Sequence, residues 1–167
     1  MTKKKTIIAL DLGTTGNRAI AFDETGKIKA QSYQEFKQYF PNPGWVEHDP
    51  LEILTTTLTV FRNVYKTLDP TTIAGIGITN QRETIVMWDK ESGQPCYNAI
   101  VWQCRRGQKV CDKINKSIKN KNLIKKKTGL TLDTYFPASK LIELLNSNKK
   151  IKDKLKNGSA LFGTIDT

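Results

Sequence analysis

The sequence predicts an α/β fold in which a mixed β-sheet is flanked by helices. The first 36 residues contain three short strand-like segments separated by glycine-containing turns. An amphipathic helical pattern begins near residue 50, and a further apolar strand-like segment follows at 73–79. Strands interspersed with helices along one chain are typical of domains in which helices pack on the faces of a sheet.

The N-terminal segment predicts three antiparallel strands. Residues 7–11 form an apolar run that ends in a carboxylate, and residues 12–16 form a turn rich in glycine and threonine. Residues 18–23 alternate between apolar and polar side chains, residues 24–27 form a hairpin turn, and residues 27–36 form the third strand. Short turns of this kind join strands that run antiparallel.

A helix is predicted to begin at Asp49-Pro50. Asp49 suits the N-cap, Pro50 suits the first helical position, and Glu52 can act as the reciprocal cap. Asp69-Pro70 stops the helix, because proline cannot continue it. The apolar residues at helical spacing between these signals are Leu51, Leu54, Leu58, Phe61, Tyr65 and Leu68.

The later segments complete the fold prediction. Residues 73–79 predict a buried strand, residues 84–89 and 98–102 predict two more, and the chain becomes helical after Arg106. This order fits the actin-like ATPase (ribonuclease H-like) fold better than a Rossmann fold, which would open with a G-x-G-x-x-G turn after its first strand. A P-loop is excluded as well, because Thr164 stands where that motif needs lysine.

The composition is that of a globular protein with a core. The chain has 167 residues, of which 38% are hydrophobic and 26% are charged. The apolar run after the basic N-terminus ends at Asp11, too early for a signal peptide or a membrane helix. Cys96, Cys104 and Cys111 contain no C-x-x-C pair, so we expect free thiols in a cytoplasmic protein. The single histidine, His48, excludes a histidine-based zinc site.

The net charge of +11 is concentrated in the second half of the chain. Residues 109–156 contain 14 lysines and four acidic residues. A basic surface of this kind suits an acidic partner, such as nucleic acid. The aromatic residues that could stack on bases are limited to Tyr135 and Phe136 in this half. We therefore expect no nucleic acid and no membrane as partner, and a binding or regulatory module stays open as an alternative.

The segment Asp11-Leu-Gly-Thr-Thr-Gly-Asn-Arg18 carries residue types that suit a phosphate group. Its two glycines let backbone amides approach an anion closely, and Thr14 and Thr15 add hydroxyl donors. Arg18 can neutralise phosphate charge, and Asp11 can hold Mg²⁺ as one of the few carboxylates that such an ion needs. Taken alone, the segment is a weak signal that favours an ordinary polar hairpin turn with a basic neighbour.

A second group of candidate residues lies at the ends of the strands between residues 77 and 106. Arg82 offers fixed donors and Glu83 offers acceptors, so the pair can hold neighbouring hydroxyl groups. Trp102 offers a flat apolar face for a carbon backbone. A small polyhydroxy compound is the expected ligand. The alternatives are a surface ion pair for Arg82 and Glu83 and a core position for Trp102.

These segments also resemble the glycerol kinases of the FGGY family of carbohydrate kinases. The resemblance rests on the hairpin at 11–18, on Gln81-Arg-Glu and on Val101-Trp-Gln-Cys-Arg-Arg, and it covers nearly the whole chain. Further matching segments are 44–50, 127–133 and 161–167.

The resemblance implies roles for individual residues. Those that match contacts to the nucleotide phosphates are Thr14, Thr15, Gly16 and Arg18. Those that match contacts to glycerol are Arg82, Glu83, Trp102 and Tyr135. Gly16 stands at a position that is usually serine in the family. ATP and Mg²⁺ are the implied cofactors, and Asp11 is the candidate magnesium ligand.

The resemblance also implies that other parts are needed. Family members have two actin-like domains, with ATP and substrate in the cleft between them, and their aspartate general base lies beyond the segment that this chain resembles. We therefore expect a partial FGGY N-terminal domain over residues 1–167. Residues 1–102 are its strand-rich core with the phosphate hairpin, and residues 103–167 are its mainly helical part.

The expected function is that of the N-terminal part of an ATP-dependent glycerol kinase, which phosphorylates glycerol to sn-glycerol 3-phosphate. The chain alone is expected to be inactive, because its general base lies beyond Thr167. A separately encoded C-terminal half is a candidate partner. The alternatives are a truncated inactive gene product, a binding module, or a kinase for another small polyol or sugar.

Overall fold

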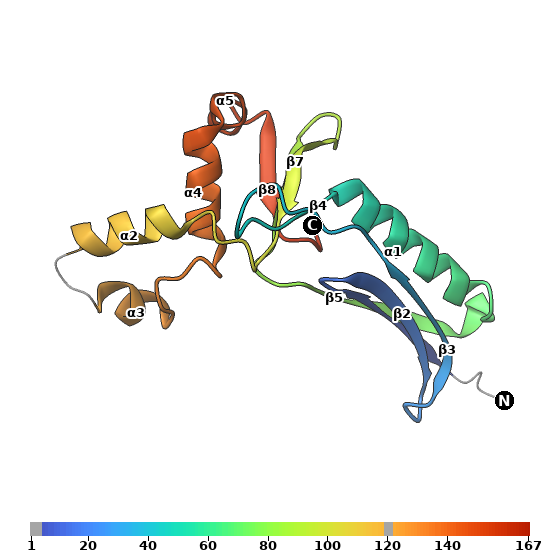
Figure 1. Ribbon diagram of the computed structural model, residues 1–167. Coiled ribbons are helices and arrows are strands. Elements are labelled where there is room, and N and C mark those ends of the chain that lie inside the picture. Colours follow the sequence, from blue (N-terminus) through green and yellow to red (C-terminus); the bar gives the residue numbers. More distant parts are fainter. Residues whose placement is uncertain (1–4, 119–121) are drawn as a thin grey trace. The chain divides into compact units, whose positions relative to one another are not determined.

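The computed structural model describes residues 5–118 and 122–167, and these form two compact units (Figure 1). The first unit contains the chain up to Gln38, together with His48–Gln81 and Ile165–Thr167. The second unit contains Tyr39–Glu47 and Arg82–Thr164.

The first unit is built on a mixed sheet. Its strands are β1 (Thr6–Leu12), β2 (Gly16–Asp23), β3 (Ile28–Glu35) and β5 (Ile73–Asn80), in the order β3-β2-β1-β5. β2 is antiparallel to both β1 and β3, and β5 is parallel to β1. The three predicted N-terminal strands and the mixed sheet are therefore confirmed.

Helix α1 (Pro50–Tyr65) packs on this sheet, as Figure 1 shows, and the predicted N-cap is correct. The Asp49 carboxylate accepts a hydrogen bond of 2.8 Å from the Leu51 N–H. The predicted reciprocal cap at Glu52 is not formed, because its carboxylate instead accepts from the Lys37 N–H at 3.1 Å. The short 3₁₀ helix η1 (Pro70–Thr72) follows α1 and leads into β5.

The buried face of α1 differs from the leucine stripe that marks the helix in the sequence. The buried side chains are Ile53, Thr56, Val60 and Val64. Leu54 is instead 54% exposed. A buried Asn17 on β2 orients the helix, because its side-chain amide donates to the Ile53 carbonyl at 2.9 Å and to the Thr56 hydroxyl at 2.7 Å. This polar anchor turns a mixed face of α1 toward the sheet.

Strand β5 lies at one edge of the sheet and is not buried, contrary to the prediction for residues 73–79. Ile76 is 52% exposed and Ile78 is 58% exposed. Both are in register with buried residues of β1, Ile8 and Leu10. Within the described residues α1 packs mainly on β2 and β3, which leaves the apolar side chains of β5 uncovered.

In the part that the structure describes, the second unit contains a four-stranded sheet and four helices. The sheet order is β4-β7-β6-β8, formed by β4 (Glu47–His48), β6 (Ile85–Asp89), β7 (Pro95–Ile100) and β8 (Ala160–Gly163). The helices are α2 (Gln108–Ser117), α3 (Leu123–Thr128), α4 (Pro137–Ser147) and α5 (Lys149–Lys156). The predicted strand at 84–89 is confirmed, whereas the one at 98–102 begins earlier, at Pro95, and ends at Ile100.

A buried ion pair lies in the core of the second unit. The guanidinium group of Arg106 bonds to the carboxylate of Glu47, and both side chains are almost fully buried. The Tyr97 hydroxyl and the Asn98 amide donate to the same carboxylate at 2.9 and 3.0 Å. The Arg106 guanidinium also lies 4.0 Å from the centre of the Trp45 ring. Glu47 is thus fully partnered, as a buried charge requires.

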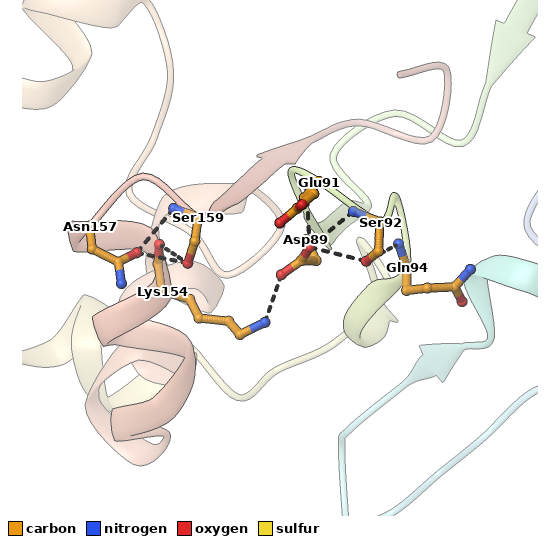
Figure 2. Close-up of polar contacts among 7 residues, drawn as sticks. All are labelled: Asp89, Glu91, Ser92, Gln94, Lys154, Asn157 and Ser159. Atoms are coloured by element: carbon orange, nitrogen blue, oxygen red, sulfur yellow. Dashed lines mark hydrogen bonds and ion pairs between the residues drawn. The ribbon is translucent and has the colours of Figure 1, made fainter.

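A polar junction ties the β6–β7 turn to α5, as Figure 2 shows. The Asp89 carboxylate accepts from the Ser92 N–H at 3.1 Å and from the Lys154 ammonium at 2.8 Å. The Lys154 hydrogen bond, followed by those from Ser92, holds the pKa of Asp89 below its usual range. Asn157 supports the far end of α5 by accepting from the Ser159 N–H.

The helices offer no membrane-spanning candidate. Across residues 5–118 and 122–167, none combines the length and the apolar character needed to cross a bilayer.

Candidate functional site

The β1–β2 turn carries the first candidate site and is compact. The Gly13 N–H donates to the Gly16 carbonyl at 3.1 Å. A Cβ atom on Gly13 would lie 2.8 Å from that carbonyl oxygen, so the turn requires glycine there. A Cβ atom on Gly16 would lie 2.5 Å from the Gln34 carbonyl and 2.8 Å from the Tyr33 ring. The space that a serine side chain would need at Gly16 is therefore occupied in this chain.

The charged residues beside the turn lie in one row across the sheet. Asp11 is in register with Arg18 on β2 and with Thr79 on β5, and Arg18 is in register with Tyr33 on β3. Residues directly opposite each other on neighbouring strands share a face of the sheet. Leu10 and Leu12, on either side of Asp11, are buried in the core, so the row faces away from α1.

Tyr33 supports this row, and its role is not predictable from the sequence motif. The Arg18 guanidinium carbon lies 5.2 Å from the centre of the Tyr33 ring, and the Tyr33 hydroxyl lies 3.4 Å from the Thr15 hydroxyl. A cation over an aromatic face is attracted to it. Tyr33 thus holds Arg18 beside the turn. Only the strand register reveals this, because Tyr33 is distant from the motif in the sequence.

The second candidate site begins at the turn between β5 and β6. Arg82 is exposed and Glu83 is half-buried. Glu83 has a φ of 66°, and it is the only positive-φ residue other than glycine among those described. A non-glycine residue held there costs on the order of 1–3 kcal/mol and is typical of functional sites. The strain therefore supports a binding role for this turn.

Trp102 and Tyr135 form an aromatic pair at a polar hollow. Their ring centres lie 5.6 Å apart, and the rings meet edge to face. The backbone N–H of Trp102 donates to the Thr84 hydroxyl at 3.1 Å, which ties Trp102 to the turn that carries Arg82 and Glu83. The hollow beside the two rings has a volume of about 280 Å³. Its lining residues are Trp102, Gln103, Arg105, Gln108, Asp133, Thr134 and Tyr135.

Lys140 positions the segment that carries Tyr135. It is fully buried, and its ammonium group donates to the Thr134 carbonyl at 3.0 Å and to the Tyr135 carbonyl at 2.5 Å. Burial lowers the pKa of Lys140 to about 8, while the nearby carboxylates of Glu83 and Asp133 act in the opposite direction. Lys140 therefore links Glu83 electrostatically to the Tyr135 segment.

The structure brings three of the four predicted polyol residues into one neighbourhood. Trp102 contacts Tyr135 directly, and Glu83 is linked to Tyr135 through Lys140. Arg82 is exposed and lies on the same turn as Glu83. The phosphate hairpin belongs to the other unit.

The structure also permits the predicted magnesium ligand. Among the described residues, no three His, Cys, Asp or Glu side chains gather in a group that could hold a metal ion. Asp11 supplies one exposed carboxylate beside the hairpin. Mg²⁺ in phosphate sites is usually held by one or two carboxylates together with phosphate oxygens and water. A single carboxylate at this place fits that pattern.

Comparison with known proteins identifies the family. Residues 6–167 match the N-terminal domain of the FGGY family of carbohydrate kinases. The chain belongs to this family. The glycerol kinase of Francisella philomiragia is 51% identical over 166 residues, and that of Leptospira biflexa is 50% identical over 169 residues. These alignments cover 98% and 100% of this FGGY chain.

A solved structure supports the actin-like fold prediction. The crystal structure of Plasmodium falciparum glycerol kinase with ADP matches this FGGY chain with a TM-score of 0.90 and 36% identity, over 98% of the chain. The match covers 33% of that protein, and the two curated relatives are covered to 33% and 34%. The chain thus spans about a third of the length of the relatives that it matches.

Proposed function

We propose that this chain is the N-terminal part of an ATP-dependent glycerol kinase, which phosphorylates glycerol to sn-glycerol 3-phosphate. The observation that carries the proposal is the identity of about half of all residues with glycerol kinases along the whole chain. The aromatic pair at a polar hollow and the strained Glu83 turn support it independently.

In this proposal the β1–β2 hairpin binds the ATP phosphates. Thr14 and Thr15 donate from their hydroxyl and amide groups, and the Gly16 backbone approaches the phosphates closely. Arg18, held over the Tyr33 ring, neutralises phosphate charge. Asp11 would hold the Mg²⁺ that accompanies ATP, and the bound ion would supply further neutralisation of the phosphate charge.

Glycerol binds in the second unit. Arg82 donates to its hydroxyl groups and Glu83 accepts from them, which orients a terminal hydroxyl for reaction. Trp102 packs on the carbon backbone, and the Tyr135 hydroxyl beside it adds a further polar contact. The roles of these four residues are binding and orientation.

We further propose that the 167-residue chain alone does not catalyse the phosphorylation of glycerol. The general base is an aspartate expected beyond Thr167, and a base typically contributes about 10²–10⁴-fold to the rate. Phosphoryl transfer also depends on holding both substrates in line. A kinase that consumes MgATP belongs in the cytoplasm, which is the location we assign to it.

Complementation tests the proposed function. The chain is co-expressed with the remaining two thirds of the Francisella philomiragia relative, or fused to it, and ATP-dependent phosphorylation is measured with glycerol, xylulose and gluconate. We expect turnover with glycerol in preference to the two others, and no turnover by either part alone. A well-folded complex that phosphorylates none of the three compounds would refute the proposal, and a preference for a sugar would refute its substrate.

A further inference from the structure

Two glutamine side chains donate hydrogen bonds to the backbone of the β1–β2 turn. The Gln81 side-chain amide donates to the Gly13 carbonyl at 3.2 Å. The Gln38 side-chain amide donates to the Thr14 carbonyl at 3.0 Å. Two successive carbonyls of the turn are therefore fixed by side chains. Gln81 directly follows β5, and Gln38 lies in the segment after β3.

Fixing these two carbonyls also fixes two N–H groups. In a planar trans peptide, the C=O of one residue and the N–H of the next point in opposite directions. The Gly13 carbonyl therefore orients the Thr14 N–H, and the Thr14 carbonyl orients the Thr15 N–H, both away from the glutamines. Successive backbone N–H groups that point the same way form an anion-binding concavity.

The two glutamines are joined by His48. Its Nε2 lies 2.6 Å from the Gln38 Oε1, and its Nδ1 lies 3.2 Å from the Gln81 Nε2. An amide oxygen can only accept and an amide nitrogen can only donate. The pattern therefore assigns the neutral imidazole with its proton on Nε2, which donates to Gln38 and accepts from Gln81.

The surroundings of His48 favour this neutral state. The side chain is fully buried, and the Phe36 ring packs against it edge to face at 4.9 Å between ring centres. Burial lowers the pKa of His48 to about 4, so the ring is neutral at physiological pH. With the proton on Nδ1 instead, the Nδ1–H donor would face the Gln81 amide donor. At least one glutamine would then lose its hydrogen bond to the ring and its position at the turn.

We propose that His48 is a positioning residue for the phosphate hairpin: its single tautomer orients the Gln38 and Gln81 amides, which in turn aim the Thr14 and Thr15 N–H groups at the phosphates. The inference rests on the proposed phosphate role of the hairpin. His48 itself touches no reacting atom. Its effect passes through two side-chain amides and two peptide planes.

The first test reads the tautomer directly in the full 167-residue chain. Because His48 is the only histidine, a ¹⁵N spectrum of histidine-labelled protein reports this ring alone. We expect a neutral ring with the proton on Nε2. A spectrum of the Nδ1–H form, or of a charged ring at neutral pH, would overturn the inference.

The second test compares His48→Phe with the original chain. Phenylalanine keeps an aromatic ring beside Phe36 and removes both ring nitrogens. We expect shifted amide resonances of Thr14 and Thr15 in a ¹H–¹⁵N spectrum, because their peptide planes reorient, and an affinity for magnesium tripolyphosphate that is about tenfold lower in a ³¹P titration. The double variant His48→Phe with Gln38→Met should bind no more weakly than His48→Phe alone, because both changes break one chain of contacts.

Val60→Ala is the matched control for general destabilisation. Val60 is 1% exposed and lies in the apolar core of the same unit, packed with Ile8 and Leu10 of β1. It should lower stability and leave both readouts unchanged under native conditions. Equal affinity of His48→Phe and the original chain would overturn the positioning role. If the original chain binds no tripolyphosphate, the proposed phosphate site fails, and the tautomer and the Thr14 and Thr15 amide shifts then decide the positioning role alone.

Discussion

At the scale of single residues, the two candidate sites share one design. Each site contains a buried polar side chain with a positioning role. This side chain supports the backbone of the residues that we propose bind the substrate. His48 acts in this way on the hairpin through Gln38 and Gln81. Lys140 acts directly on the carbonyls of Thr134 and Tyr135.

Lys140→Met tests the second of these supports. Methionine keeps the unbranched apolar stem but removes the ammonium donors, so the Tyr135 carbonyl loses its partner. In the complemented enzyme we expect the KM for glycerol to rise about tenfold, and the KM for ATP to stay within about twofold. Lys149→Met changes an exposed lysine on α5 and should alter neither value. Equal kinetics in the two variants would contradict a positioning role for Lys140.

Residue identities were predictable where the chemistry lies in one short motif. Arg82 and Glu83 are neighbours in the sequence, and their donor and acceptor groups indicate hydroxyl recognition without any structure. The positive φ of Glu83 and the burial of Lys140 were not predictable, because both depend on packing between segments distant in the chain. The contact between Tyr33 and Arg18 was not predictable for the same reason.

At the scale of elements, local patterns predicted the strands better than the faces they bury. Alternation and turn residues located the three N-terminal strands and the N-cap of α1. The buried face of α1 was not evident, because Asn17 on a distant strand selects it. Strand β8 pairs with β6, which lies about 70 positions earlier, and such long-range pairing leaves little local signal.

The hairpin gives a stability prediction for the element. Gly16→Ser introduces the side chain that the family resemblance would favour, but its Cβ would lie 2.5 Å from the Gln34 carbonyl on β3. We expect a loss of about 1–3 kcal/mol in the free energy of unfolding, measured by urea denaturation, because the backbone must shift. Gly75→Ala on β5 is the control, since no atom lies within 4 Å of its Cβ. An unchanged free energy of unfolding for Gly16→Ser would contradict this prediction, because it would mean that β3 shifts to make room at no energetic cost.

At the scale of the whole molecule, the chain carries residues that we propose bind two different substrates. It spans about a third of the length of the relatives that it matches. β5 exposes apolar side chains, Ile76 and Ile78, on a sheet edge. Residues proposed for the phosphates lie in one unit, and residues proposed for glycerol lie in the other. We therefore propose that each unit binds a different substrate.

Steady-state kinetics of the complemented enzyme test this division most directly. Arg82→Met should raise the KM for glycerol at least tenfold and leave the KM for ATP within about twofold, because it removes a contact to one substrate only. Arg18→Met should raise the KM for ATP at least tenfold and leave the KM for glycerol within about twofold. The account is contradicted if either variant changes both KM values equally, or if neither variant changes any.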